Sequence, residues 1–235
     1  MIDYRHRSYK KELLDADDIP FADIRLNMQE LEFINTHLGG HQITIEGFKT
    51  LVAGKKKVSI CEVGCGGGDN LDAIYKWSLQ NNLEPSFYGI DINANCIAYA
   101  KTRSIVPDCK FIISDYREVT FENVRPDIIF SSLFCHHFSN QELIEMMQWM
   151  KDNSTLGFFI NDIHRHPIAY YFIKWMTGLF SRSYLVKHDA PLSVLRGFKK
   201  HEWKKIIAGA GIGSFIIRWK WAFRHLVIVK NSPVS

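Results

Sequence analysis

The chain has 235 residues, of which 46% are hydrophobic, and its 29 basic and 25 acidic residues give a formal net charge of +4. This composition predicts one globular domain with an elaboration, and the weak charge disfavours a nucleic-acid-binding protein. The five cysteines lack C-x-x-C spacing, so we expect no disulfide framework and no metal site. The polar N-terminus and the lack of a long apolar stretch predict a cytoplasmic protein without an integral membrane segment.

The first fifty or so residues are expected to be helical. After Phe21, apolar residues recur at helical spacing at Ile24, Met28, Leu31, Ile34 and Leu38. Gly39 and Gly40 end this helix, and a second one is expected from about Thr44 to Val52. We therefore treat residues 1–54 as an N-terminal helical cap and residues 55–235 as the core domain.

From residue 55 onward, apolar strand patterns alternate with helical patterns, which predicts a parallel sheet. We expect strands near 57–63, 86–91, 109–114, 127–133 and 156–163, and helices near 69–81, 94–103, 140–151 and 200–210. Two further β-rich runs, 214–219 and 226–229, are separated by too few residues for a crossover helix. They should form an antiparallel hairpin.

A glycine-rich loop follows the first of these strands, with the spacing Glu62-x-Gly64-x-Gly66-x-Gly68. Glycines let the backbone approach a ligand closely, and the helix that follows offers free N–H groups. The loop departs from the dinucleotide fingerprint because Asp69 stands where the last glycine would be. A carboxylate before the first glycine repels a pyrophosphate but suits a ligand that carries an amine. The plainer alternative is a glycine-rich turn between strand and helix.

This loop resembles motif I of the class I S-adenosylmethionine (SAM)-dependent methyltransferases, whose ligand carries an ammonium and a sulfonium group. Two more predicted strands end in acids, Asp91 and Asp115. The resemblance implies that Asp91 binds the ribose hydroxyls and that Asp115 meets the adenine amino group, although Asp91 could instead cap the helix that starts near Asn93. The cofactor contacts expected in this way are Glu62, Gly64, Cys65, Gly66, Gly68, Asn70, Asp91, Ile92, Asp115, Tyr116 and Ser131.

The resemblance also implies a fold. We expect an α/β protein with a Rossmann-like, seven-stranded, mostly parallel sheet and a C-terminal antiparallel hairpin. The segment 164–198 does not fit the minimal core of such a fold and is expected to be a helical insert. Its residues after Pro167 are aromatic or aliphatic around most of a helix. This helix could be a lid over an apolar pocket, or could pack under the N-terminal helices, and its contact with a membrane surface stays open.

Two neighbouring histidines, His136 and His137, follow the fourth predicted strand. The surrounding residues resemble the small-molecule branch of the family, which includes the ubiquinone- and menaquinone-biosynthesis methyltransferases. The Asn/Asp-Pro-Pro-Tyr element of nucleobase N-methyltransferases is missing. Because adjacent side chains face different directions, at most one histidine should point into the site. We expect His137, or else His136, to be a general base, whereas the plainer role of each is to cap or pack the loop.

Four polar residues at the end of the fifth predicted strand, and one before the last helix, are candidates for the acceptor site. They are Asp162, His164, Arg165, His166 and Arg196. Arg165 could hold an acidic or phenolate group. Metal binding by His164 and His166 is disfavoured because no third ligand is evident.

Together these features predict a SAM-dependent methyltransferase that O-methylates a small aromatic or lipophilic hydroxyl compound, such as a phenolic or polyketide-like metabolite. The first alternative is C-methylation of a quinone-type precursor, and the second is a non-catalytic SAM-binding protein. We expect the protein to bind a small-molecule acceptor and no nucleic acid. The sequence also allows a homodimer.

Overall fold

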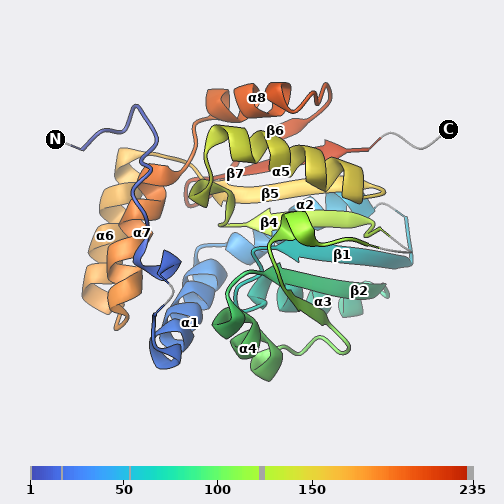
Figure 1. Cartoon of the computed structure of the whole chain (residues 1–235), viewed down its shortest axis with the longest axis horizontal. Helices are drawn as coiled ribbons and strands as arrows, with labels where there is room; N and C mark the ends of the chain where they lie inside the picture. The colour runs from blue at the N-terminus through green and yellow to red at the C-terminus, as the bar shows by residue number, and fades with distance from the viewer. Residues whose placement is uncertain (1, 17, 53, 122–124, 232–235) are drawn as a thin grey trace.

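A seven-stranded sheet runs through the computed structural model, which describes residues 2–16, 18–52, 54–121 and 125–231 (Figure 1). The strand order is β3-β2-β1-β4-β5-β7-β6. The strands are β1 (Lys57–Val63), β2 (Glu84–Asp91), β3 (Lys110–Ile113), β4 (Ile128–Ser132), β5 (Gly157–Ile163), β6 (Ile216–Lys220) and β7 (Arg224–Lys230). The first five pair in parallel, and β7 runs antiparallel to both β5 and β6. The predicted fold class is confirmed.

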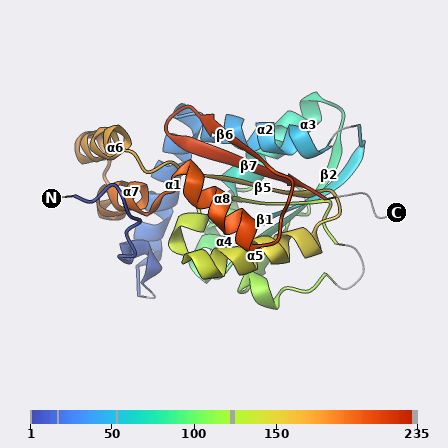
Figure 2. The same ribbon diagram turned by 90° about the horizontal axis from the view of Figure 1, so that it is seen from above.

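Helices cover both faces of the sheet (Figure 2). They are α1 (Phe21–His37), α2 (Gly40–Val52), α3 (Asp69–Gln80), α4 (Ala94–Arg103), α5 (Asn140–Asn153), α6 (Pro167–Phe180), α7 (Tyr184–Arg196) and α8 (Lys200–Gly209). One apolar core joins the sheet to α5 and α8, around Met146 and Trp203. The other joins it to α2, α3 and α4, around Phe48 and Ile74. Every residue of β4 is buried, as expected for a central strand covered on both faces.

The site lies where the strand order changes direction. From β1 the chain first builds outward through β2 to β3 and then returns to place β4 on the other side of β1. In open parallel sheets this reversal leaves a crevice outside the carboxyl ends of the strands, where ligands bind. The glycine loop after β1 and the residues that follow β2, β3 and β4 all reach this edge.

The N-terminal region and the insert differ from the prediction. The second helix, α2, begins at Gly40 rather than Thr44 and packs directly against β5 and β7, so it belongs to the helical layer of the sheet. The insert holds two helices, α6 and α7, where only the one after Pro167 was described from the sequence, and Pro191 stands inside α7. A short 3-10 helix, η1 (Leu13–Asp15), precedes α1 and contacts α7. No helix among the described residues is long and apolar enough to span a bilayer.

Candidate active site

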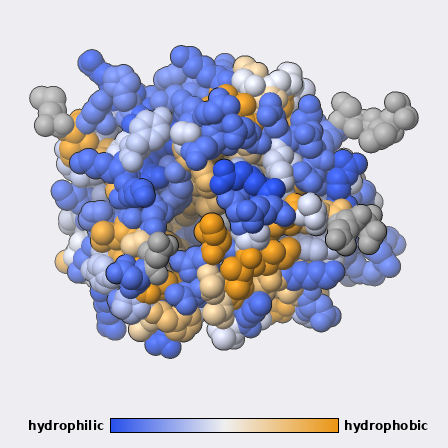
Figure 3. All heavy atoms as spheres, in the orientation of Figure 1, coloured by the Kyte–Doolittle hydropathy of each residue, from blue (hydrophilic) through white to orange (hydrophobic). Residues whose placement is uncertain are grey.

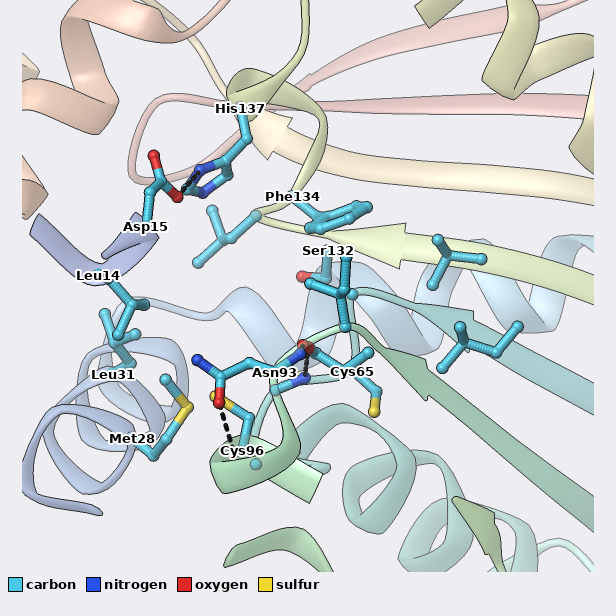
Figure 4. Close-up of a pocket in the computed structure, with 18 of the residues that line it drawn as sticks. Leu14, Asp15, Met28, Leu31, Cys65, Asn93, Cys96, Ser132, Phe134 and His137 are labelled. Atoms are coloured by element: carbon cyan, nitrogen blue, oxygen red, sulfur yellow. Dashed lines mark hydrogen bonds and ion pairs between the residues drawn. The ribbon is translucent and has the colours of Figure 1, made fainter. Parts of the chain in front are cut away.

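A cavity of about 840 Å³ opens at the carboxyl edge of the sheet, and Figure 4 shows side chains converging on it from several elements. One end is formed by the glycine loop and the residues after β2 and β3. The other end is formed by α1, η1, the short helix η3 (Cys135–His137) and the end of α7. Ligand pockets commonly measure about 300–1,000 Å³. This cavity is therefore large enough for a nucleoside cofactor and a second small molecule.

The glycine loop turns sharply away from β1. Gly64 has φ +71°, and a Cβ on it would overlap with the ring of Phe134, so glycine is required there for two reasons. The N–H groups of Gly64 and Cys65 both donate to the carbonyl of Ile90, at 2.9 and 3.1 Å, which ties the loop to the end of β2. Bare backbone therefore forms this part of the cavity wall.

Asp91 closes the other side of the loop. Its carboxylate accepts hydrogen bonds from the N–H of Gly66, at 2.8 Å, and from the N–H of Asn93, at 2.9 Å. The helix cap of α4 is Asn93, whose side chain accepts from Asn95 and Cys96, so the alternative role of Asp91 as that cap is wrong. Burial raises the pKa of Asp91, and the two backbone hydrogen bonds offset part of this effect. Ile92 lines the cavity beside it.

Glu62 lies beneath the loop and is not part of the cavity wall. Its side chain is fully buried and accepts a hydrogen bond from the amide of Asn70, at 3.0 Å. Its second oxygen, Oε2, has no partner among the described residues. Burial, reinforced by the charge of Asp69, raises the pKa of Glu62 well above its usual range. A buried carboxyl with a free oxygen is a fitting counter-group for a cationic ligand in the loop.

Three polar residues that were not predicted as cofactor contacts stand beside this end. Asp69 lines the cavity and accepts hydrogen bonds from His41 Nε2, at 2.7 Å, and from the amide of Asn35, at 3.1 Å. Burial raises the pKa of Asp69, but these partners outweigh it and leave the pKa lowered, so Asp69 is a carboxylate at neutral pH. Asn35 and His41 come from two N-terminal helices, and no local sequence pattern links them to this loop.

The remaining expected cofactor contacts divide into two groups. Asp115 and Tyr116 line the cavity, and Asp115 is paired with Arg117, with 2.9 Å between Nε and Oδ1. Gly68 and Ser131 do not line it: Ser131 is buried 3.4 Å from the sulfur of Cys135, and its neighbour Ser132 takes the place at the wall.

The fourth strand leads into the opposite end through Leu133, a cavity residue with φ +52°. A left-handed backbone is strained for leucine, and such residues concentrate at functional sites. This turn directs Phe134 and His137 toward the cavity (Figure 4). Nδ1 of His137 lies 3.1 Å from Oδ1 of Asp15, which comes from η1.

His136 points the other way, into the protein. Nδ1 of His136 lies 2.8 Å from Oδ1 of Asp162, and Nε2 lies 3.6 Å from Glu12. Burial alone lowers the pKa of His136, but Asp162 and Glu12 outweigh it and raise the pKa to about 9. His136 is therefore a buried imidazolium between two carboxylates and does not line the cavity, so its prediction as the second candidate base is wrong.

One group of residues could hold a metal ion, contrary to expectation. The ligand atoms of Glu12, His136 and His137 lie within 4.8 Å of one another. A metal would need the lone pair of His136, which carries a proton at neutral pH for the reasons above. We therefore describe the three residues as an ion-paired network.

Two arginines attach the N-terminal segment to this end. Arg196 lines the cavity, but its guanidinium donates to the carbonyls of His136, His137 and Lys10, at 3.0, 2.9 and 2.6 Å. Arg7 donates to the carbonyls of Phe138 and Arg196, at 2.9 Å each. These bonds fix η3 against residues 7–15 and indicate a positioning role for Arg196 rather than substrate binding.

The other predicted acceptor residues do not reach the cavity. Asp162 is buried against His136. Arg165 is also buried and donates to the carbonyls of Tyr4, Gly197 and Arg5 and to Glu202, so its prediction as an anion-binding residue is wrong. His164 and His166 pack around Phe223 on the outside. A polar residue at the end of a strand can be expected to lie near the sheet edge. Its position does not predict the direction in which its side chain points.

Comparisons with known proteins agree with this fold. Residues 60–153 match the family model described as "Methyltransferase domain". No curated protein matches the chain. A solved structure of the plantazolicin methyltransferase BpumL with S-adenosylhomocysteine (SAH) is 15% identical, with TM-score 0.65, over 90% of this chain and 96% of that one.

Two other similar structures contain SAM. Magnesium protoporphyrin IX methyltransferase from Synechocystis PCC 6803 is 14% identical, with TM-score 0.54, over 84% of this chain and 82% of that one. Human N-acetylserotonin methyltransferase is 13% identical, with TM-score 0.63, over 91% of this chain and 57% of that one. Residues 60–153 thus form a methyltransferase domain, and the chain shares the fold of these SAM- and SAH-bound methyltransferases.

Proposed function

We propose that the protein transfers the methyl group of SAM to a hydroxyl oxygen of a small aromatic or lipophilic molecule. The observation that carries this proposal is the position of His137, which stands at the cavity end opposite the glycine loop and is held by Asp15. A hydroxyl group must lose its proton when its oxygen is methylated, and an imidazole is a suitable base near neutral pH.

The loop end would hold the cofactor, and its residues suit a cationic nucleoside. The backbone of Gly64 and Gly66 leaves room for close contact, Asp91 offers its remaining lone pairs to ribose hydroxyls, and the unpartnered Oε2 of Glu62 lies below the loop. When bound there, SAM supplies a methyl group that is already activated by a positive sulfur.

The acceptor would lie at the other end, where the lining is largely apolar. Leu14 lies nearest to Asp15 and His137, and Leu31 and Met28 continue this apolar wall toward Cys96 (Figure 4). Desolvation by these side chains favours an aromatic or aliphatic acceptor over a strongly charged one. The pocket holds the acceptor in line with the methyl group, and proximity of this kind contributes most of the rate in such a displacement.

His137 would take the hydroxyl proton on Nε2, while Nδ1–H donates to Asp15. That hydrogen bond sets the tautomer and the ring orientation. Nε2 lies 3.7 Å from Glu12 Oε2, which is too long for a hydrogen bond, so the nitrogen keeps its lone pair for the acceptor. Asp15 is thus a positioning residue.

The similar structures support a small organic acceptor without identifying it. Two of them are named for magnesium protoporphyrin IX and N-acetylserotonin, which are aromatic molecules. C-methylation of a quinone precursor remains the nearest rival. A ring carbon becomes nucleophilic when a neighbouring hydroxyl loses its proton, so this reaction also needs a base.

The test is methyl transfer from isotope-labelled SAM to a panel of phenols, with the product's methyl group assigned by NMR as O–CH₃ or C–CH₃. His137→Asn should lower kcat/KM by about 10²–10³-fold and leave the Kd for SAM unchanged. His201→Asn, an exposed histidine of α8, is the matched control. A product with C–CH₃ would favour the rival, and full activity of His137→Asn would remove the base. Tight SAM binding without turnover of any acceptor would favour a non-catalytic protein.

A further inference from the structure

The outward face of α6 carries large apolar side chains that are mostly exposed. Its exposed members are Ile168, Tyr171, Phe172, Trp175, Leu179 and Phe180, each with between 45% and 70% of its surface accessible. Figure 2 shows α6 at one end of the molecule, away from the sheet, and Figure 3 shows hydrophobic surface among hydrophilic residues on that side. Apolar side chains gathered in this way on one helix mark an interaction surface.

The helix is held by its opposite face. Ala169, Tyr170 and Ile173 are buried against α7, where Val194 belongs to the same cluster. The outward side chains therefore add nothing to this packing. A helix needs one apolar face to fold onto its domain. The second apolar face of α6 requires another explanation.

The charges of the chain segment that contains this face have one sign. Between Ile163 and His188 the chain contains no aspartate or glutamate. Lys174, Arg182 and Lys187 are exposed in the same segment. Near the end of α6, Glu30 accepts hydrogen bonds from the backbone of Arg182 and Ser183, so its charge is directed at these N–H groups.

We propose that the outward face of α6 docks on an anionic lipid bilayer. Aromatic side chains with a polar edge prefer the boundary between headgroups and acyl chains, and lysines beside them can extend to the lipid phosphates. Each basic residue near such a surface adds to the attraction. The 14-residue helix is about 21 Å long, so it would lie in the plane of the interface.

A second copy of the chain is a poorer partner for this face. In a symmetric dimer each patch meets its own copy, so Lys174 and the other cations would face like charges. An anionic bilayer instead complements both the apolar and the charged part of the surface. α6 is connected to the site through α7, because α6 packs on α7, and α7 carries Arg196 to the cavity wall.

Docking on a bilayer also specifies the acceptor of the proposed function: it would be a phenolic lipid that reaches the cavity from the membrane. This part of the inference rests on the proposed function. The apolar lining around Leu14 and Leu31 suits such a molecule. Binding to the bilayer itself does not depend on which molecule is methylated.

The test is sedimentation of the full chain with phosphatidylcholine vesicles that contain 0 or about 30% phosphatidylglycerol. We expect binding to the anionic vesicles that weakens with added salt. Leu179→Glu should lower the partition coefficient at least tenfold, because it places a carboxylate in the docking face. Leu79→Glu on α3 is the matched control, with 58% exposure against 62%, and should bind as the wild type does.

Three results would overturn the docking proposal. They are absence of binding to anionic vesicles, equal loss in both variants, and a dimer in analytical ultracentrifugation that Leu179→Glu dissociates while vesicle binding is unchanged. Turnover of a water-soluble phenol should be the same in wild type and Leu179→Glu. If the wild type binds vesicles and methylates no hydroxyl, the proposed function fails and the docking surface stands.

Discussion

At the glycine-loop end of the cavity, the loop and Asp91 lie close together in the sequence, whereas the His137 end joins segments up to 189 residues apart. At the first end, Gly66 and Asp91 belong to consecutive strand ends of one βαβ unit. At the second, Asp15 and His137 meet only because the N-terminal segment crosses the sheet edge. From this difference we expect substitutions at the loop end to alter SAM binding, and substitutions at the His137 end to alter the kinetics with the acceptor.

The largest expected effect tests the loop end. Gly64→Ala should lower the free energy of unfolding by about 2–4 kcal/mol and abolish measurable SAM binding, because the new Cβ overlaps with Phe134 and φ is +71°. Gly211→Ala is the control, since Gly211 has φ +69° but no atom lies within 4 Å of the position that a Cβ would take there. It should cost about 1 kcal/mol and leave binding intact. Calorimetric titration and thermal melts measure both quantities, and equal effects of the two variants would contradict the overlap.

The second prediction concerns the stability of the His137 end. The folded-state pKa of His136 is about 9, above its ordinary value of 6.5. Its contribution to stability is therefore complete below about pH 6.5 and is lost as the pH rises through 9. The free energy of unfolding should fall by about 3 kcal/mol more in the wild type than in His136→Asn over that interval. Urea titrations at several pH values measure this, and parallel curves for the two proteins would exclude a buried imidazolium.

A third, smaller effect returns to the loop end. Asp91→Asn should weaken SAM binding about 10–100-fold, because an amide keeps one acceptor oxygen where the carboxylate offers two. Asp108→Asn, at an exposed position, is the control. If both variants bind SAM as the wild type does, Asp91 holds only the loop and not the ribose.

The smallest effect should appear at the acceptor end alone. Asp189 accepts hydrogen bonds from the N–H groups of Leu13 and Leu14, at 2.8 and 2.9 Å, and so anchors η1 to α7. Asp189→Asn loses one of these acceptors, and we expect the KM for the acceptor to rise up to about tenfold. The Kd for SAM should not change. An equal loss in SAM affinity would show that the two ends are coupled.

Sequence reasoning predicted the elements whose signals are local. Apolar runs bounded by turn residues indicated all seven strands, and the loop after β1 was recognised from the alternate positions Glu62, Gly64, Gly66 and Gly68. The same reasoning missed α7, because Pro191 disfavours a helix interior and only the packing of Leu185, Val186 and Val194 compensates.

The candidate site was predicted in part, for a related physical reason. Polar residues at strand ends were identified by position, but their direction depends on partners far away in the sequence. Arg165 was expected to bind a ligand, yet three backbone carbonyls and Glu202 occupy its guanidinium. Glu12 and Asp15 went unnoticed because nothing in the first fifteen residues indicates that they meet His136 and His137.

The attachment of the N-terminal segment also sets an order of assembly on the ribosome. Residues 7–15 leave the exit tunnel first, but their partners Asp189 and Arg196 are made about 180 residues later. The strands around the glycine loop can pair as soon as they emerge, since domains fold from the N-terminus during synthesis. Residues 7–15 therefore stay unattached until the segment with Asp189 and Arg196 has been made.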